Sequence, residues 1–199
     1  MGLLTWFHGS VIHSRRVGVL ARHIAPLLPR NASVLDVGCG DGWLSAEVKR
    51  LRPDVTVTGV DVLVRSHTHI PVQPFDGTTL PMADRSVDVV MFVDVLHHTA
   101  DPLVLLREAR RVAQAIVIKD HDRHAFLGDA TLRFMDRVGN ARHGVALPFN
   151  YWTKADWQRA FEREGLSVEA WETSLRLYPV PLRWVFDRSL HFIARLATS

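Results

Sequence analysis

The stretch that decides the fold reads VLDVGCGDGW and runs from Val34 to Trp43. Its apolar start predicts a short buried strand, and the glycines that follow at every second position, Gly38, Gly40 and Gly42, predict a tight turn into a helix. Glycine has no Cβ atom, so such a turn also lets a ligand touch the backbone. We therefore take this strand-to-helix turn as a candidate binding site.

Two common ligands of glycine turns do not suit this one. A phosphate loop needs a Gly-Lys pair, which the chain lacks. A dinucleotide fingerprint needs a glycine where Trp43 stands, and Asp41 would repel a pyrophosphate at the helix N-terminus. Asp36 and Asp41 instead suit an adenosine ligand that has no phosphate and carries positive charge. S-adenosylmethionine is such a ligand. Asp61, roughly 20 residues past the glycines, is placed to accept both ribose hydroxyls.

Strand and helix patterns alternate along most of the chain. Apolar or β-branched runs predict strands at 33–37, 56–61, 72–75, 86–93, 115–118 and 166–173, and helical spacing predicts helices in the first thirty residues and at 42–52, 101–112, 125–138 and 153–164. Residues 190–197, LHFIARLA, suit either an edge strand or a helix. The alternation predicts a mainly parallel α/β sheet with helices on both faces, and such sheets bind ligands beyond the carboxyl ends of their strands.

Composition and charge exclude several classes of protein. With 199 residues, 47% of them hydrophobic and 23% charged, the chain fits one soluble domain. No apolar run reaches the ~18 residues of a membrane span, and the N-terminus lacks the basic start of a secretory signal. Cys39 is the single cysteine, so no internal disulfide forms and a cytoplasmic location is expected. The basic residues are scattered without interleaved aromatics, so we expect no nucleic-acid binding.

The ordered motifs of the chain resemble those of a known family. They are VLDVGCGDG (34–42), VTGVD (57–61), an acid before LPMADRSVDVV, DVLHH (94–98) and a strand leading to KDH (119–121). In this order they resemble the class I S-adenosylmethionine-dependent methyltransferases, in the small-molecule group (methyltransferase type 11) that includes quinone-ring methyltransferases. The resemblance covers residues 17–173 and implies a doubly wound, mainly parallel seven-stranded Rossmann-like sheet. Its last strand is antiparallel, and residues 190–197 are the candidate for it.

The resemblance also implies roles for the residues of these motifs. The glycines of the turn hold the methionine part of the cofactor, and Asp36 orients the loop or the ammonium group. Asp61 holds the ribose, and Asp76 accepts from the adenine amino group. The segment 94–96 lies under the methionine and opens onto the acceptor. The cofactor-binding set predicted in this way is Asp36, Gly38, Cys39, Gly40, Asp41, Gly42, Asp61, Val62, Asp76, Gly77, Asp94, Val95 and Leu96.

Simpler structural roles compete with some of these assignments. The glycine turn could serve packing alone, Asp76 could form a plain turn with the glycine after it, and Asp94 could cap the loop after its strand. Cys39 suits packing better than nucleophilic attack. In some relatives a basic residue near the N-terminus touches the carboxylate of the cofactor, which makes Arg15 or Arg16 a further candidate.

Methyl transfer to a phenol, enol or alcohol needs a base. His97, His98 and His121 are the predicted catalytic residues, because they follow predicted strand ends and titrate near neutrality, and His124 is a further candidate. Together with the aspartates of DHDRH (120–124) these histidines could converge on a metal ion. Their spacing matches no zinc pattern, so no metal is expected.

We expect a single domain over residues 1–199 that moves the methyl group of S-adenosylmethionine to an O, C or N atom of a small, lipophilic acceptor and releases S-adenosylhomocysteine. DVLHH differs from the NPPY type that amino methylation of DNA bases or protein glutamine would suggest. Segments 122–152 and 174–189 are expected on the substrate side, either as a lid with peripheral membrane contact or as part of the core. The alternatives are a non-catalytic S-adenosylmethionine-binding accessory or sensor protein and an oxidoreductase on a similar fold.

Overall fold

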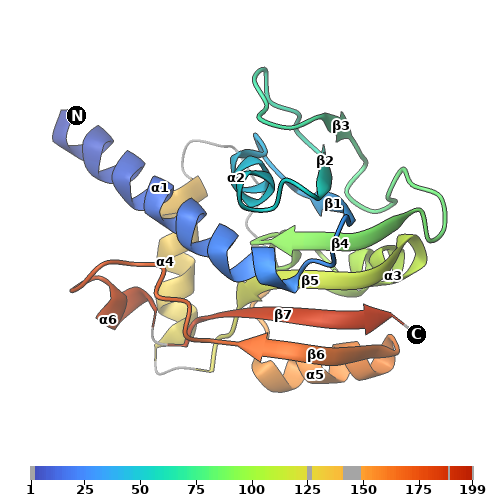
Figure 1. The fold of residues 1–199 in the computed structure, drawn as a ribbon. Helices are drawn as coiled ribbons and strands as arrows, with labels where there is room; N and C mark the ends of the chain where they lie inside the picture. Colours follow the sequence, from blue (N-terminus) through green and yellow to red (C-terminus); the bar gives the residue numbers. More distant parts are fainter. Residues whose placement is uncertain (1–2, 125–126, 141–148, 188, 199) are drawn as a thin grey trace.

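The computed structural model describes residues 3–124, 127–140, 149–187 and 189–198. In this part of the chain a seven-stranded sheet has the order β3-β2-β1-β4-β5-β7-β6 (Figure 1). The strands are β1 (Ser33–Val37), β2 (Thr56–Asp61), β3 (Val72–Pro74), β4 (Val87–Val93), β5 (Ala113–His121), β6 (Leu166–Glu172) and β7 (His191–Thr198). The α-helices are α1 (Leu3–Ile24), α2 (Trp43–Leu51), α3 (Pro102–Val112), α4 (Gly128–Asn140), α5 (Lys154–Arg163) and α6 (Arg183–Phe186), and the short 3-10 helices are η1 (Ala25–Leu27) and η2 (Leu96–His98).

The last strand of the chain, β7, runs antiparallel to both of its neighbours, β5 and β6. The other strand pairs are parallel, so the predicted Rossmann-like sheet with an antiparallel last strand is confirmed. The prediction of an edge strand at residues 190–197 is wrong, because β7 lies inside the sheet and β6 forms the edge. The four side chains from His191 to Ala194 are accordingly buried, as expected for a strand covered on both faces.

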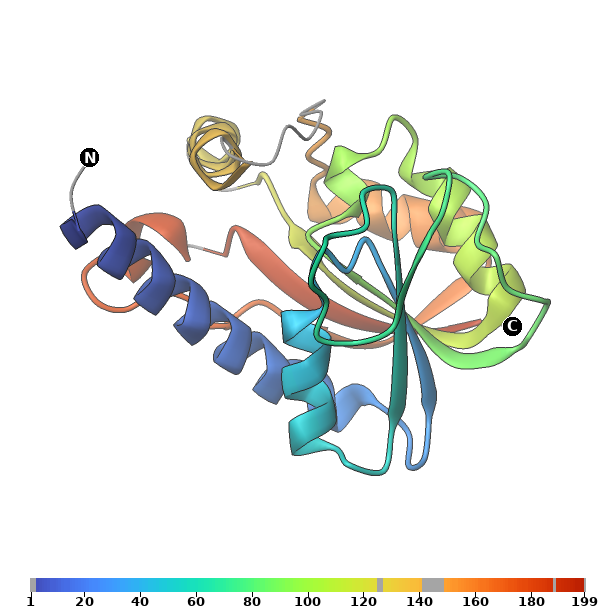
Figure 2. The same cartoon turned by 90° about the horizontal axis from the view of Figure 1, so that it is seen from above.

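Helices cover both faces of the sheet, as the alternation predicts (Figure 2). On one face, Val90 and Phe92 of β4 pack in a core with α3 and α5. On the other face, Val89 and Met91 of the same strand pack with α1 and α2. Alternate residues of β4 therefore enter two separate cores, because successive side chains of a strand point to opposite faces.

The strand β5 is longer than its sequence indicates. The prediction ends it at residue 118 and places KDH (119–121) after it, whereas the strand continues to His121. Neighbouring strands supply backbone partners beyond the apolar run: β4 pairs with Lys119 and β7 pairs with His121. Three polar side chains are thereby carried into the buried interior, where each needs a polar partner.

Helix boundaries follow local capping signals. Thr153 and Asp156 form a capping box at the start of α5, with Thr153 N–H donating to Asp156 Oδ2 at 2.9 Å, so the predicted N-cap is confirmed. The helix predicted at 125–138 corresponds to α4, which begins at Gly128, and residues 125 and 126 lie outside the described part of the chain. Within the described ranges, no helix is long and apolar enough to cross a membrane.

Candidate functional site

A pocket of about 480 Å³ opens at the carboxyl end of β1, which has β2 on one side and β4 on the other. In α/β sheets such a switch point is where ligands bind. The wall combines α1, the glycine turn, the start of α2, the loop after β2 and the end of β4. The lining residues are His13, Val17, Asp36, Gly38, Cys39, Gly40, Asp41, Trp43, Leu44, Arg65, Ser66, His67 and Val93.

The glycine turn adopts a backbone conformation that favours glycine, with φ of +71° at Gly38, +60° at Gly40 and +75° at Gly42. Gly38 N–H donates to the carbonyl oxygen of Val60 at 2.8 Å, which ties the turn to β2. A Cβ atom on Gly38 would lie 2.6 Å from Cγ2 of Val95, whereas no described atom would lie within 4 Å of a Cβ atom on Gly40. Packing therefore requires Gly38, and Gly40 leaves open space at the pocket.

Asp61 holds the glycine turn from the end of β2. Its Oδ2 accepts a hydrogen bond from Gly40 N–H and its Oδ1 accepts one from Leu63 N–H, each at 2.8 Å. The neighbouring Val62 is 65% exposed, so its side chain is open to contact with a ligand. Each carboxylate oxygen has a second lone pair, so Asp61 can hold Gly40 and still accept from a ribose hydroxyl.

Asp36, before the turn, and Cys39, within it, both make close contacts inside the protein. Asp36 is buried, its Oδ2 accepts from Ser45 Oγ at 2.6 Å, and burial raises the pKa of Asp36 to about 7. The Cys39 Sγ fills the space beside Gly59, where a Cβ atom would lie 2.4 Å away. Burial also raises the pKa of the Cys39 thiol, so this side chain acts as a packing group, as expected, and not as a nucleophile.

Two further acids of the predicted set hold local turns. Asp41 Oδ1 accepts from Trp43 N–H at 3.0 Å at the start of α2. Asp76 Oδ1 accepts from the N–H groups of the two threonines after Gly77, each at 2.7 Å, and these bonds lower the pKa of Asp76. The plain-turn role of Asp76 is thus present in the structure. Its second oxygen, Oδ2, is where a contact with the adenine amino group is still predicted.

Asp94, directly after β4, has its carboxylate between two cations. It forms an ion pair with the fully buried Lys119 and accepts from Arg16 Nη2 at 3.1 Å. Burial by itself would raise the pKa of Asp94, but the charge of Lys119 holds it well below its ordinary value. Arg16 also lies over the ring of Tyr178, 5.7 Å from its centroid. Of the two arginines considered for the cofactor carboxylate, Arg16 is therefore paired with Asp94, and Arg15 is exposed.

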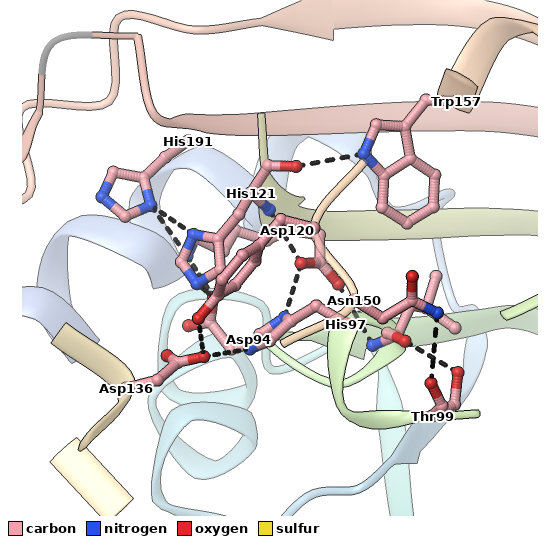
Figure 3. Close-up of polar contacts among 12 residues, drawn as sticks. Asp94, His97, Thr99, Asp120, His121, Asp136, Asn150, Trp157 and His191 are labelled. Atoms are coloured by element: carbon pink, nitrogen blue, oxygen red, sulfur yellow. Dashed lines mark hydrogen bonds and ion pairs between the residues drawn. The ribbon is translucent and has the colours of Figure 1, made fainter. Parts of the chain in front are cut away.

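The three predicted catalytic histidines lie together after β4 and at the end of β5, and Figure 3 shows two of them, His97 and His121. The ring centroid of His97 lies 4.0 Å from that of His98 and 4.5 Å from that of His121. His97 Nδ1 lies 2.6 Å from Asp120 Oδ1, and its Nε2 lies 3.4 Å from Asp136 Oδ2, an ion-pair distance without good hydrogen-bond geometry. Burial opposes a charge on this ring, but the two carboxylates outweigh burial and raise the pKa of His97 to about 10.

The other two histidines differ in their surroundings. His121 is buried, its Nδ1 lies 3.1 Å from Nδ1 of His191, and burial keeps its pKa well below the ordinary value. His98 is half-buried, and its Nδ1 has no hydrogen-bond partner among the described residues. Burial and the charge of His97 lower the pKa of His98. Leu96, just before these histidines, is fully buried, so its side chain packs in the core and does not open onto an acceptor.

Comparisons with known proteins agree with this geometry. Residues 12–170 match the family described as a methyltransferase domain. The chain belongs to this family. A ubiquinone biosynthesis O-methyltransferase from Azorhizobium caulinodans is 35% identical over 106 residues, which cover 48% of this chain and 40% of that protein. The 27-O-demethylrifamycin SV methyltransferase of Amycolatopsis mediterranei is 30% identical over 108 residues, which cover 47% of this chain and 39% of that protein.

These alignments span less than half the length of the curated relatives. Among solved structures, a chain in the complex between the Haloferax volcanii Trm112 methyltransferase activator and a methyltransferase superposes with a TM-score of 0.72 and 15% identity. That superposition covers 95% of this chain and 92% of the other. The fold is that of the class I S-adenosylmethionine-dependent methyltransferases, as the motifs of the sequence predict.

The site also contains polar contacts whose partners the sequence does not predict. Tyr151 O–H donates to Asp136 Oδ2, and Lys119 Nζ lies 3.3 Å from His191 Nδ1. Figure 3 shows Asp136 and His191. Lys119 stands in the KDH motif, so its place near a strand end is a usable signal. Asp136 on α4 and His191 on β7 carry no local signal, because helix and strand patterns do not show which buried acid or histidine meets another.

Some histidines and carboxylates of the chain are as close together as ligands of a metal ion. The groups within 4.8 Å of one another are His97 with Asp120 and His121, and His97 with His98 and Asp136. Protein donors already occupy their carboxylates: Asp120 accepts from His97, His121 N–H and Leu96 N–H, and Asp136 accepts from Tyr151. Asp122 instead pairs with His124 at 2.8 Å. We assign no metal ligand among these residues.

Proposed function

We propose that this methyltransferase binds S-adenosylmethionine in the pocket at the end of β1 and transfers its methyl group to a hydroxyl oxygen of a small acceptor. The observation that carries the proposal is Gly40, which borders the pocket with open space where a side chain would stand. Its N–H donates to Asp61 at the end of β2, the acid that is predicted to accept from the ribose of the cofactor.

The residues around the pocket fit a cationic adenosine ligand. Asp36 and Asp41 line it, and their hydrogen-bond donors are Ser45 Oγ for Asp36 and the N–H of Trp43 for Asp41. The charge of Asp41 favours the ammonium and sulfonium groups of the cofactor and disfavours a pyrophosphate, and a bound cation would favour the ionised form of Asp36. Asp61 and Val62 would hold the ribose and the adenine ring at the neighbouring rim.

Bound S-adenosylmethionine supplies an activated methyl group, so the protein mainly has to position the acceptor and take up its proton. Correct positioning of two reactants is worth about 7–11 kcal/mol of the barrier. Ubiquinone biosynthesis O-methyltransferases are among the curated relatives, which supports a hydroxyl acceptor. Of the three predicted catalytic histidines, His98 is half-buried, whereas His97 and His121 are buried among protein groups. His98 is therefore our candidate base.

A lipophilic acceptor that reaches the enzyme from a membrane surface is supported by exposed apolar side chains. Phe134 and Val138 on α4 are 57% and 63% exposed, and Trp184 on α6 is 68% exposed. Figure 1 shows α4 and α6 at the end of the molecule toward which the arrow of β4 points. The buried Leu177 and Tyr178 belong to the core, so segment 174–189 is only partly a surface element. Flotation with anionic liposomes tests this contact, and absence of binding would remove the membrane part of the proposal.

Calorimetric titration tests the cofactor, with S-adenosylmethionine and S-adenosylhomocysteine as ligands and NADH as the control. We expect micromolar binding of the first two and none of NADH. Binding of NADH alone would contradict the proposal and favour an oxidoreductase. An acceptor screen among phenols, quinols and hydroxylated lipids then separates an enzyme from a non-catalytic sensor, since a sensor binds the cofactor without turnover.

A further inference from the structure

The pocket at the end of β1 is lined by an arginine that has no protein partner. Arg65 belongs to the loop after β2, and its side chain is half-buried at the pocket. Among the described residues, its guanidinium makes no ion pair, hydrogen bond or ring contact. Charged groups that are partly removed from water are usually paired. The guanidinium of Arg65 is therefore free to bind an anionic group of a ligand in this pocket.

The loop that carries Arg65 is fixed against the glycine turn. Near the end of the loop, His69 N–H donates to the carbonyl oxygen of Asp41 at 2.7 Å. The next residue, Ile70, is buried and packs so closely on the turn that a Cβ atom on Gly42 would lie 2.4 Å from its Cγ1. These contacts hold the loop, and Arg65 with it, at the rim of the pocket that the glycine turn forms.

The charged groups that line the pocket are opposite in sign to those of S-adenosylmethionine. The cofactor carries an ammonium group, a sulfonium group and a carboxylate. Apart from histidines, the charged residues among the described lining are two acids, Asp36 and Asp41, and one arginine, Arg65. Opposite charges attract more strongly in a pocket than in open water, because the surroundings are less polar. The two acids suit the cationic groups of the cofactor, which leaves Arg65 for its carboxylate.

The two arginines near the N-terminus are less well placed for this carboxylate. Neither Arg15 nor Arg16 is among the described residues that line the pocket. Arg16 is paired with Asp94 and lies over the ring of Tyr178, and Arg15 is exposed. The cation that some relatives supply from the N-terminus is therefore committed to another partner, or faces solvent, in this chain.

We propose that Arg65 is a positioning residue that binds the carboxylate of S-adenosylmethionine from the loop after β2. A planar guanidinium can form two parallel hydrogen bonds with a carboxylate, which fixes direction as well as distance. This contact would orient the amino-acid end of the cofactor over the glycine turn and make the pocket select ligands that carry a carboxylate. The inference rests on the proposed function, because it needs the cofactor in this pocket.

The decisive experiment compares two ligands that differ only in the carboxylate. Decarboxylated S-adenosylmethionine keeps the ammonium and sulfonium groups, and calorimetry with the full chain measures its affinity beside that of S-adenosylmethionine. We expect the wild type to prefer S-adenosylmethionine by about 10–100-fold, as hydrogen bonds to a charged group give. In Arg65→Gln this preference should disappear, while the affinity for the decarboxylated ligand is retained. Arg65→Lys keeps the charge without the planar fork, so it should retain part of the preference.

Arg110→Gln is the matched control, because it removes the same charge from an exposed arginine in the last turn of α3. This turn leads into the start of β5 and so lies at the end of the sheet opposite the pocket. The control should leave the affinities for both ligands unchanged. A preference for the carboxylate that survives in Arg65→Gln, or one that is lost in Arg15→Gln instead, would overturn the inference.

A third ligand separates failure of this inference from failure of the proposed function. An arginine after the second strand also suits the 2′-phosphate of a dinucleotide, so NADPH is titrated in parallel. Binding of NADPH to the wild type that is lost in Arg65→Gln, without binding of S-adenosylmethionine, would overturn both. Equal binding of S-adenosylmethionine to the wild type and to Arg65→Gln would leave the proposed cofactor in place and overturn the inference alone.

Discussion

Val95 packs so closely on Gly38 that a Cβ atom there would lie 2.6 Å from Cγ2 of the valine. This contact joins the glycine turn after β1 to the segment after β4, which continues into η2 with His97 and His98. The pocket wall and the histidines are therefore neighbours through a tightly packed contact. A substitution in the glycine turn should therefore disturb the segment after β4, and a substitution in that segment should disturb the turn.

Gly38→Ala should destabilise the protein through both steric overlap and backbone strain. The overlap is with Val95, and φ at Gly38 is +71°, where a side chain alone costs about 1–3 kcal/mol. Gly40→Ala is the matched control, because it has a similar φ of +60° but no described atom within 4 Å of the added Cβ atom. Thermal unfolding should show the larger loss for Gly38→Ala. Equal losses would contradict the packing argument.

The same pair of variants should separate in cofactor binding. In Gly40→Ala the added methyl group enters the space that we assign to S-adenosylmethionine, so calorimetry should show a loss of affinity that exceeds its loss of stability. An affinity for S-adenosylmethionine equal to that of the wild type in a folded Gly40→Ala variant would place the cofactor elsewhere.

Asp61→Ala should weaken S-adenosylmethionine binding. The change removes the acceptor for Gly40 N–H and the predicted acceptor for the ribose hydroxyls, and hydrogen bonds to a charged group contribute about 1.5–3 kcal/mol each. We expect an affinity about 10–100-fold lower by calorimetry. Asp84→Ala is the control, because Asp84 is an exposed acid before β4, at the opposite end of that strand. A comparable loss in Asp84→Ala would show a general effect of charge.

Asp36 should make the protein less stable as the pH rises. Its pKa in the fold is about 7, above its ordinary value of 3.8, so the folded state binds the proton more tightly than the unfolded state. The stability that protonated Asp36 contributes is present below about pH 4 and is lost as the pH rises to about 7. The Asp36→Asn variant cannot ionise at this position. Between about pH 4 and pH 7 its free energy of unfolding in urea should therefore increase by a few kcal/mol relative to that of the wild type. A pH-independent difference would contradict the raised pKa.

His97 should also stabilise the fold through a raised pKa, but here the protonated form is the charged one. Its pKa in the fold is about 10, above the ordinary 6.5, because Asp120 and Asp136 stabilise the imidazolium form. The contribution is fully present below about pH 6.5 and is lost as the pH rises through about 10. The difference in unfolding free energy between wild type and His97→Gln should therefore shrink from pH 6 to pH 10. A constant difference would show that His97 is neutral in the fold.

Local patterns in the sequence predicted several elements to the residue. The strands at 33–37 and 56–61 match β1 and β2, because each apolar run is followed by a glycine or an acid that ends it. The start of α5 was predicted from Thr153, since capping involves only the first turn. The same kind of pattern misplaced 190–197 at an edge, because alternation describes the faces of a strand and not its neighbours in the sheet.

The sequence by itself determined the glycine turn, the acid that ends β2 and the family to which the chain belongs, because these signals lie within short stretches of chain. Only the tertiary structure decided which charges meet. Lys119 pairs with Asp94 from a position 25 residues away, and His121 meets His191 across 70 residues. Such contacts depend on the order of the strands, and burial then decides the pKa values, because the cost of a charge depends on the water and the partner charges around it.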